Sequence, residues 1–103
     1  MKKSSIAAQI TATKHEKNVS DGVPVICSYL LRYCIKRDGT ICRKMDIEID
    51  EGMVKKRQTG CWTIWCKLQR YILENTEELK QILHVWKNKF EQADYDVEVV
   101  IHE

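Results

Sequence analysis

Hydrophobic and polar residues alternate along the two stretches that flank the dipeptide Asp38-Gly39. The apolar positions of the two stretches face one another only if the connecting loop holds three residues, 37–39. Glycine tolerates the left-handed conformation that such a loop needs at its last position. We therefore expect a β-hairpin over residues 25–49 with one apolar and one charged face. The predicted pairs are Lys36 with Thr40, Ile35 with Ile41, Cys34 with Cys42, Tyr33 with Arg43, Leu31 with Met45, Tyr29 with Ile47, and Cys27 with Ile49.

Four other segments show extended or loop patterns. Residues 6–13 alternate between apolar and polar side chains, which is typical of a strand. Residues 14–22 are rich in loop formers, and residues 53–58 show no clear period, so we expect both to be exposed connections. Alternation resumes over residues 95–101 and predicts a last strand.

Helical spacing begins at Thr59, which could act as an N-cap. Apolar residues at 61, 64, 65, 68, 71 and 72 follow the i, i+3, i+4, i+7 rule and predict a helix of about thirteen residues. Asn75 and Glu78 then resemble a capping box, with Glu78 reaching back to the start of a second helix. An alternative is one long bent helix over residues 59–93. The apolar stripe of the second helix comprises Leu79, Ile82, Leu83, Trp86 and Phe90.

These elements predict an α+β fold. We expect a four-stranded, mainly antiparallel sheet in β-β-β-α-α-β order, with two helices packed on one face. The chain of 103 residues has room for one domain, 1–103, in which residues 1–5 form a loose end.

Charge and cysteine content indicate which partners and which cellular compartment the protein is expected to have. A net charge of +2 is too small to imply nucleic acid or an anionic membrane by itself. Basic residues gather between positions 32 and 57, whereas the last thirteen residues are acidic, and such a dipolar surface suits a charge-complementary protein. We expect no membrane segment, because no apolar run approaches about 18 residues. Five cysteines, an odd number, without an export signal predict a reducing cytoplasm.

No motif for catalysis, phosphate binding or metal binding occurs in the sequence. Cys34 and Cys42 lie opposite each other in the predicted register, but two further zinc ligands are missing, so we interpret all five cysteines as packing residues. Asp46, Glu48 and Asp50 alternate along one strand and are interpreted as a solvated edge. We therefore predict a protein that is not an enzyme and binds no metal or cofactor.

The basic residues and one tryptophan are the candidate contact residues. Trp65 and Trp86 lie on the apolar stripes and are expected in the core, whereas Trp62 falls to one side of the first helix. A basic loop at 55–57 before a helix N-terminus could hold a phosphate, but acidic residues share the hairpin face. The candidates are Arg32, Lys36, Arg37, Lys44, Lys55, Lys56, Arg57 and Trp62.

In size and lack of a catalytic motif the chain is similar to small phage and mobile-element proteins that block host defence, including anti-CRISPR proteins. This likeness is carried by no motif and implies stoichiometric binding to a larger partner. We therefore predict a protein-binding module that acts as an inhibitor or adaptor on a larger protein or complex. The alternative is a nucleic-acid-binding regulator that uses the same basic residues. A homodimer, formed through the exposed edge of the first or third strand, is also considered.

Overall fold

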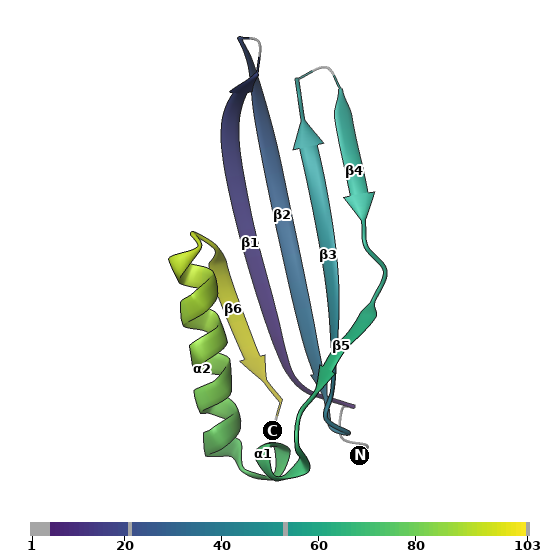
Figure 1. Cartoon of the computed structure of the whole chain (residues 1–103), viewed down its shortest axis with the longest axis vertical. Coiled ribbons are helices and arrows are strands. Elements are labelled where there is room, and N and C mark those ends of the chain that lie inside the picture. Colours follow the sequence, from purple (N-terminus) through teal and green to yellow (C-terminus); the bar gives the residue numbers. More distant parts are fainter. Residues whose placement is uncertain (1–4, 21, 53, 103) are drawn as a thin grey trace.

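The computed structural model describes residues 5–20, 22–52 and 54–102, so the expected loose end at residues 1–5 lies almost wholly outside the described residues. Most of the described chain is β-structure, in one antiparallel sheet with two helices (Figure 1). The elements are β1 (Ile6–Ser20), β2 (Val23–Lys36), β3 (Thr40–Asp50), β4 (Lys55–Thr59), β5 (Thr63–Lys67), α1 (Arg70–Glu74), α2 (Thr76–Gln92) and β6 (Asp96–Ile101).

The sheet has six strands in the described residues, not the four that the sequence predicts. Its order is β4-β3-β2-β1-β6, and β5 pairs with the other end of the β3 edge that β4 occupies. The predicted pair of helices on one face is also wrong, because α1 spans five residues and buries none of them. The coarser α+β class is consistent with the structure.

The molecule is elongated, with extents of 53 × 25 × 24 Å and a radius of gyration of 16.5 Å. A compact domain of this length has a radius of gyration of about 13 Å. Figure 1 shows why: β1, β2 and β3 run the full length of the sheet, whereas α2 and β6 lie beside only its lower half. The half of the sheet beyond α2 is called the distal half; it comprises β4 and the adjoining parts of β1, β2 and β3.

The hydrophobic core fills the half of the sheet that α2 covers. Alanines in β1 let the helix approach closely, and larger side chains from β2, β3 and α2 close the space. Leu79 and Leu83 of α2 are 4% and 2% exposed, which confirms the predicted apolar stripe at its first and third positions. The buried cluster comprises Ala8, Ile10, Tyr33, Ile35, Ile41, Leu79 and Leu83.

The hairpin of β2 and β3 has the predicted register throughout, from Cys27 opposite Ile49 to Ile35 opposite Ile41. Gly39 has a φ of +92°, and its N–H donates to the Lys36 carbonyl at 2.9 Å, so the three-residue loop is confirmed. Asp38 Oδ1 accepts a hydrogen bond of 2.8 Å from the backbone N–H of Thr40. That bond lowers the pKa of the Asp38 carboxyl below its usual value.

The first strand continues to Ser20, so the loop predicted at 14–22 is wrong. Ser20 pairs with Val23, and Gly22 has a φ of +77°, which makes this a tight two-residue hairpin turn. Pro24 is tolerated because β2 pairs with β3 only from Ile26 onward, which leaves the position of Pro24 without a neighbour on that side.

The helix predicted from Thr59 is also wrong. Residues 55–59 and 63–67 form β4 and β5, which occupy the β3 edge that would otherwise be unpaired. Gly60 lies in the connection between β4 and β5, where the chain passes close to the backbone of β3. The Gly60 N–H donates to the Met45 carbonyl at 2.7 Å, and a Cβ atom at position 60 would lie 2.8 Å from that oxygen. β-Branched and aromatic residues in 63–67 suit a strand, and strand pairing overrides the helical spacing.

The N-cap of α2 is confirmed in part. Asn75 Oδ1 accepts from the backbone N–H groups of Glu77 and Glu78 at 3.1 and 3.4 Å. The reciprocal bond from Glu78 is absent, because the N–H of Asn75 instead donates to the carbonyl of Ile72. Asn75 therefore ends α1 and caps α2 at once.

Candidate functional site

The two faces of the sheet are distinguished by the strand register, because paired residues lie on the same face and alternate along each strand. The face that packs against α2 carries Ile10, Tyr33 and Ile41 and is called the helix face. The opposite face, with Thr11, Arg32 and most of the charged residues of the hairpin, is called the outer face.

The structure does not gather the predicted basic residues into one patch. Arg32, Lys36 and Lys44 lie on the outer face near the middle and lower end of the hairpin. Arg37 lies in the β2–β3 turn, where its guanidinium donates to the His102 carbonyl at 3.1 Å. The segment 55–57 lies at the opposite end of β3, in β4 (Figure 1).

Two of the predicted contact residues do meet. Trp62, which is 47% exposed, lines a hollow of 360 Å³ on the outer face together with Arg32 and Glu98. Arg32 is also directly opposite Lys44 in the register. Two like charges in this arrangement repel each other, so an anion bound near Arg32 and Lys44 would reduce their electrostatic repulsion.

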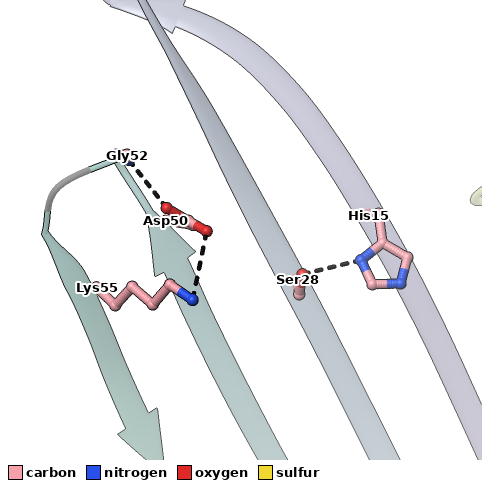
Figure 2. Close-up of polar contacts among 5 residues, drawn as sticks. All are labelled: His15, Ser28, Asp50, Gly52 and Lys55. Carbon is pink, nitrogen blue, oxygen red and sulfur yellow. Dashed lines mark hydrogen bonds and ion pairs between the residues drawn. The ribbon is translucent and has the colours of Figure 1, made fainter.

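The segment 55–57 does not precede a helix, so the predicted phosphate site at a helix N-terminus is wrong. Its residues form β4 instead, where Lys55 is opposite Asp50 and Arg57 is opposite Glu48 on the outer face. Lys55 Nζ lies 4.0 Å from Asp50 Oδ2, and Asp50 Oδ1 accepts from the backbone N–H of Gly52 (Figure 2). Lys55 and Arg57 therefore face carboxylates on the neighbouring strand, whereas Lys56 faces Ile49.

The acidic residues of β3 are not a solvated edge, because β4 covers that edge. Asp46, Glu48 and Asp50 face Thr59, Arg57 and Lys55 across the β3–β4 pair. The complementary order of charges around the Glu51-Gly52 turn is a signal in the sequence that indicates this hairpin. Asp46 Oδ1 is buried and has no hydrogen-bond partner in the described residues.

A histidine–serine pair lies on the outer face and was missed by the sequence reasoning, which placed His15 in a loop. His15 Nδ1 and Ser28 Oγ share a hydrogen bond of 2.8 Å between β1 and β2 (Figure 2). They line a hollow of 180 Å³ with Asp46, Glu48 and Arg57. Ser28 is opposite both His15 and Glu48 in the register. Among the described residues, the bond to Ser28 is the hydrogen bond found for the His15 ring, whereas a nucleophilic triad needs a further one from the imidazole to an orienting carboxylate. The pair joins two strands.

Two of the cysteines, Cys34 and Cys66, lie in settings that favour the neutral thiol. Cys34 and Cys42 are opposite each other as predicted, and all five cysteines are free. Burial raises the pKa of the Cys34 thiol above its usual value, against the weaker opposing effect of a hydrogen bond from Gln9. Burial also raises the pKa of Cys66. No cluster of three metal-ligating side chains is present among the residues that the structure describes.

The distal part of the helix face is apolar and is not covered by α2. Met45 is 47% exposed, and its neighbours on β2 and β3 are partly exposed. We call this surface the distal helix face. Its residues are Cys27, Tyr29, Leu31, Met45, Ile47 and Ile49, which are paired across the two strands.

An aromatic cleft joins the distal helix face to α2. Tyr33 is the centre of an aromatic cluster in which its ring lies 5.5 Å from Trp65, 6.0 Å from Trp86 and 5.7 Å from Phe90. Trp65 was expected in the core, but it is 46% exposed and forms one wall of a cleft of 460 Å³. Leu31 also lines this cleft and belongs to the distal helix face, so the two surfaces are continuous.

The border of this apolar surface carries more positive than negative charge. Arg43 and Lys56 share the helix face with Met45 and Ile49, and Lys89 of α2 lines the cleft. Lys14 lies over the ring of Tyr95 and forms an ion pair of 2.9 Å with Glu16. Hydrogen bonding to Glu16 raises the pKa of Lys14, against desolvation.

No family model matches the chain, and no curated protein or solved structure is significantly similar to it. Within the described residues, no helix is both long enough and apolar enough to cross a membrane.

Proposed function

We propose that the chain is a non-enzymatic protein-binding module that acts as an inhibitor or adaptor on a larger protein or protein complex. The observation that carries this proposal is the uncovered distal helix face. In an α+β fold the apolar face of a sheet is normally packed against a second layer, but α2 supplies that layer for only half of the sheet. Contiguous exposed apolar surface of this kind is typical of a binding site.

The chemistry of the polar groups supports binding over catalysis. In the described part of the chain no hydrogen bond joins the His15 ring to a carboxylate, and partial burial raises the pKa of the Cys34 thiol, which favours its less reactive, protonated form. These groups have structural roles in the sheet. The specific form of the proposal is a counter-defence inhibitor carried by a phage or mobile element, acting in the cytoplasm where free thiols persist.

The experiment is purification of the tagged full-length chain from its native host, followed by sizing of the complex with light scattering. We expect one partner at a fixed stoichiometry, retained after nuclease treatment and at raised salt. A chain that elutes alone at every concentration and salt tested contradicts the proposal. A variant with Lys55, Lys56 and Arg57 changed to glutamate tests the contribution of β4; equal recovery would remove β4 from the interface.

A second candidate function is nucleic-acid binding on the outer face, which the like-charged pair Arg32 and Lys44 beside Trp62 specifically favours. A base could stack on the exposed tryptophan while the cations contact phosphate. Binding of a single-stranded oligonucleotide should then weaken steeply as salt rises, and an Arg32→Glu substitution should abolish it. Absence of retention on heparin at low salt rules this function out.

A homodimer through the edge of the third strand is excluded by the sheet order, because β3 lies between β2 and the β4–β5 edge. The segment of β1 beyond Thr13 has no partner other than β2, so its outer edge is available for pairing. Symmetric pairing of β4 with β4, or of β6 with β6, would bring like charges together. Within the described residues, the edges left for a dimer are those of β1 and of β5, which pairs only with β3.

A further inference from the structure

We propose that the distal helix face, together with the aromatic cleft, is the docking surface for an amphipathic helix of the partner protein whose polar flanks are acidic. This inference rests on the proposed function and names the surface and the chemistry of the segment that it takes. Three features of the structure lead to it: the dimensions of the uncovered surface, its charge, and the cleft at its end.

The uncovered surface has the dimensions of a helix of moderate length. From Leu31 through Cys27 to Val25, the next residue along β2 on the same face, the strand extends about 20 Å, at about 3.3 Å per residue. A helix of about 13 residues has the same length. The chain itself shows how a helix packs on this face, because the apolar stripe of α2 covers the other half of the sheet. A partner helix would complete the same layer.

Charge at the border selects an acidic partner. Arg43, Lys56 and Lys89 form no ion pair with any residue that the structure describes. The nearby anions are Glu16, which is bound to Lys14, and Asp94, whose charge also acts on Lys14. Carboxylates on the flanks of an apolar helix would meet three unpaired cations across the interface.

The same features disfavour the other occupants. A second copy of the chain would bring the same cations together around the two apolar faces. A single-stranded nucleic acid needs ring faces along its path on which successive bases can stack. The distal helix face is mostly aliphatic, and apart from Tyr29 its rings are confined to the cleft at one end. An apolar surface with a cationic border therefore suits an acidic amphipathic peptide better than either.

The aromatic cleft supplies an anchor point at one end of this surface. Trp65 and Trp86 pack edge to face at 5.5 Å, and Phe90 continues the wall toward Tyr95. The cleft of 460 Å³ can receive a large apolar side chain of the incoming helix. Lys89 at the border would then contact a carboxylate close to that anchor.

The first test uses synthetic peptides and the full-length chain. The probe is a peptide of about 16 residues with leucine on one helical face and glutamate on the other. One control has the same composition in scrambled order, and another has lysine in place of glutamate. We expect saturable binding of the acidic peptide. Tryptophan fluorescence and the shifts of amide NMR signals measure this binding. The two controls should bind at least about tenfold more weakly. Equal binding of the scrambled or lysine peptide overturns the proposal.

The second test uses two substitutions with matched controls on the other face. Met45→Glu places a negative charge on the distal helix face, and Ile26→Glu places one on the outer face at a residue of similar exposure, 42% against 47%. Arg43→Glu and Arg32→Glu form a second pair, in which both side chains are exposed and folding is less at risk. We expect Met45→Glu and Arg43→Glu to abolish peptide binding, and both controls to retain it. Loss in the controls alone overturns the proposal.

Further outcomes separate this proposal from the proposed function. If the native partner binds wild-type and Met45→Glu protein equally, the docking surface is wrong although the protein remains a binding module. If the chain binds neither partner nor peptide, both fail. Self-association that Met45→Glu abolishes identifies a second copy as the occupant, and displacement of the peptide by an oligonucleotide identifies nucleic acid; either result overturns the acidic helix.

Discussion

At the scale of single residues, Gly39 is the position where a side chain is least tolerated. Its φ of +92° strains any residue with a Cβ atom, and that atom would lie 2.7 Å from the Leu68 carbonyl oxygen. Gly22 has a similar φ of +77° but no atom within 4 Å of such a Cβ. We expect Gly22→Ala to lower the free energy of unfolding by about 1–2 kcal/mol from backbone strain. Gly39→Ala should cost about 1–3 kcal/mol more from overpacking.

Urea denaturation of the two glycine variants measures this difference directly. The hydrogen bond of 2.8 Å from the Leu68 N–H to the Gly39 carbonyl makes the neighbouring chain hard to displace. Equal destabilisation by both substitutions would show that the Leu68 carbonyl can move away from the turn without cost.

The turn carboxylate Asp38 gives a pH dependence with a defined sign. The hydrogen bond from the Thr40 N–H favours the charged form, so the pKa of Asp38 is lower in the folded state than in the unfolded state. Its stabilising contribution is therefore complete above the unfolded value and is lost as the pH falls through the folded value. We expect Asp38→Ala to lower stability at pH 7 and to have progressively less effect as the pH falls below the ordinary pKa of an aspartate. A destabilisation independent of pH would contradict this.

At the scale of elements, β5 is held to the rest of the molecule by Trp65. Trp65 and Trp62 are similarly exposed, at 46% and 47%, but of the two only Trp65 contacts other aromatic rings among the described residues, those of Tyr33 and Trp86. Each such pair contributes about 0.5–1.5 kcal/mol beyond the burial of area. We expect Trp65→Ala to cost about 2–3 kcal/mol of unfolding free energy, and Trp62→Ala less than about 1 kcal/mol.

Chemical denaturation of both tryptophan variants is the measurement, with far-UV circular dichroism to verify that each is folded. The two substitutions remove the same side chain from neighbouring positions, so Trp62→Ala is a matched control. Equal costs would mean that exposure, and not the aromatic cluster, determines the contribution of each residue.

The elements that could be predicted from sequence are those in which burial and local chemistry agree. The β2–β3 register follows from the apolar pairs, and the cap of α2 follows from Asn75, because each choice is set by contacts that the pattern reveals. The strand β1 beyond Thr13 was missed because it lies in the distal half, where little burial imposes an alternation. Residues 59–72 were misassigned because helical spacing arose by coincidence in a segment that pairs with a distant edge.

The candidate site could not be predicted from sequence for a related reason. The sequence pattern correctly places the residues of the distal helix face on the apolar side of the hairpin, but it does not show how far the helix layer extends. Whether Met45 is core or surface depends on where α2 ends relative to β2 and β3. The basic residues were selected because they form a run of charges in the sequence. The sequence does not show that Lys55 and Arg57 face Asp50 and Glu48 across the sheet.

At the scale of the whole molecule, one strand passes through a packed half and an uncovered half. In β2, residues 26–35 pair with both β1 and β3, so the hydrogen-bonding environment is similar along this stretch. Burial on the helix face differs: Tyr33 and Ile35 lie in the core at 9% and 0% exposure, whereas Cys27 and Tyr29, on the same face of β2, are only partly buried. The distal half therefore has much less packing to oppose local opening.

Native-state hydrogen exchange should resolve these halves within the single strand. We expect the amides of Ile26 and Ser28 to exchange at least about tenfold faster than those of Tyr33 and Ile35, which should require global unfolding. Leu83→Ala should lower the free energy of unfolding by about 2–5 kcal/mol, because it removes a core side chain. Amide exchange at Tyr33 should then become faster, whereas the exchange rate at Ile26 should remain nearly the same. Uniform protection along β2 would contradict the division into halves. Binding of a partner to the distal helix face should protect Ile26 and Ser28, because the missing layer is then supplied.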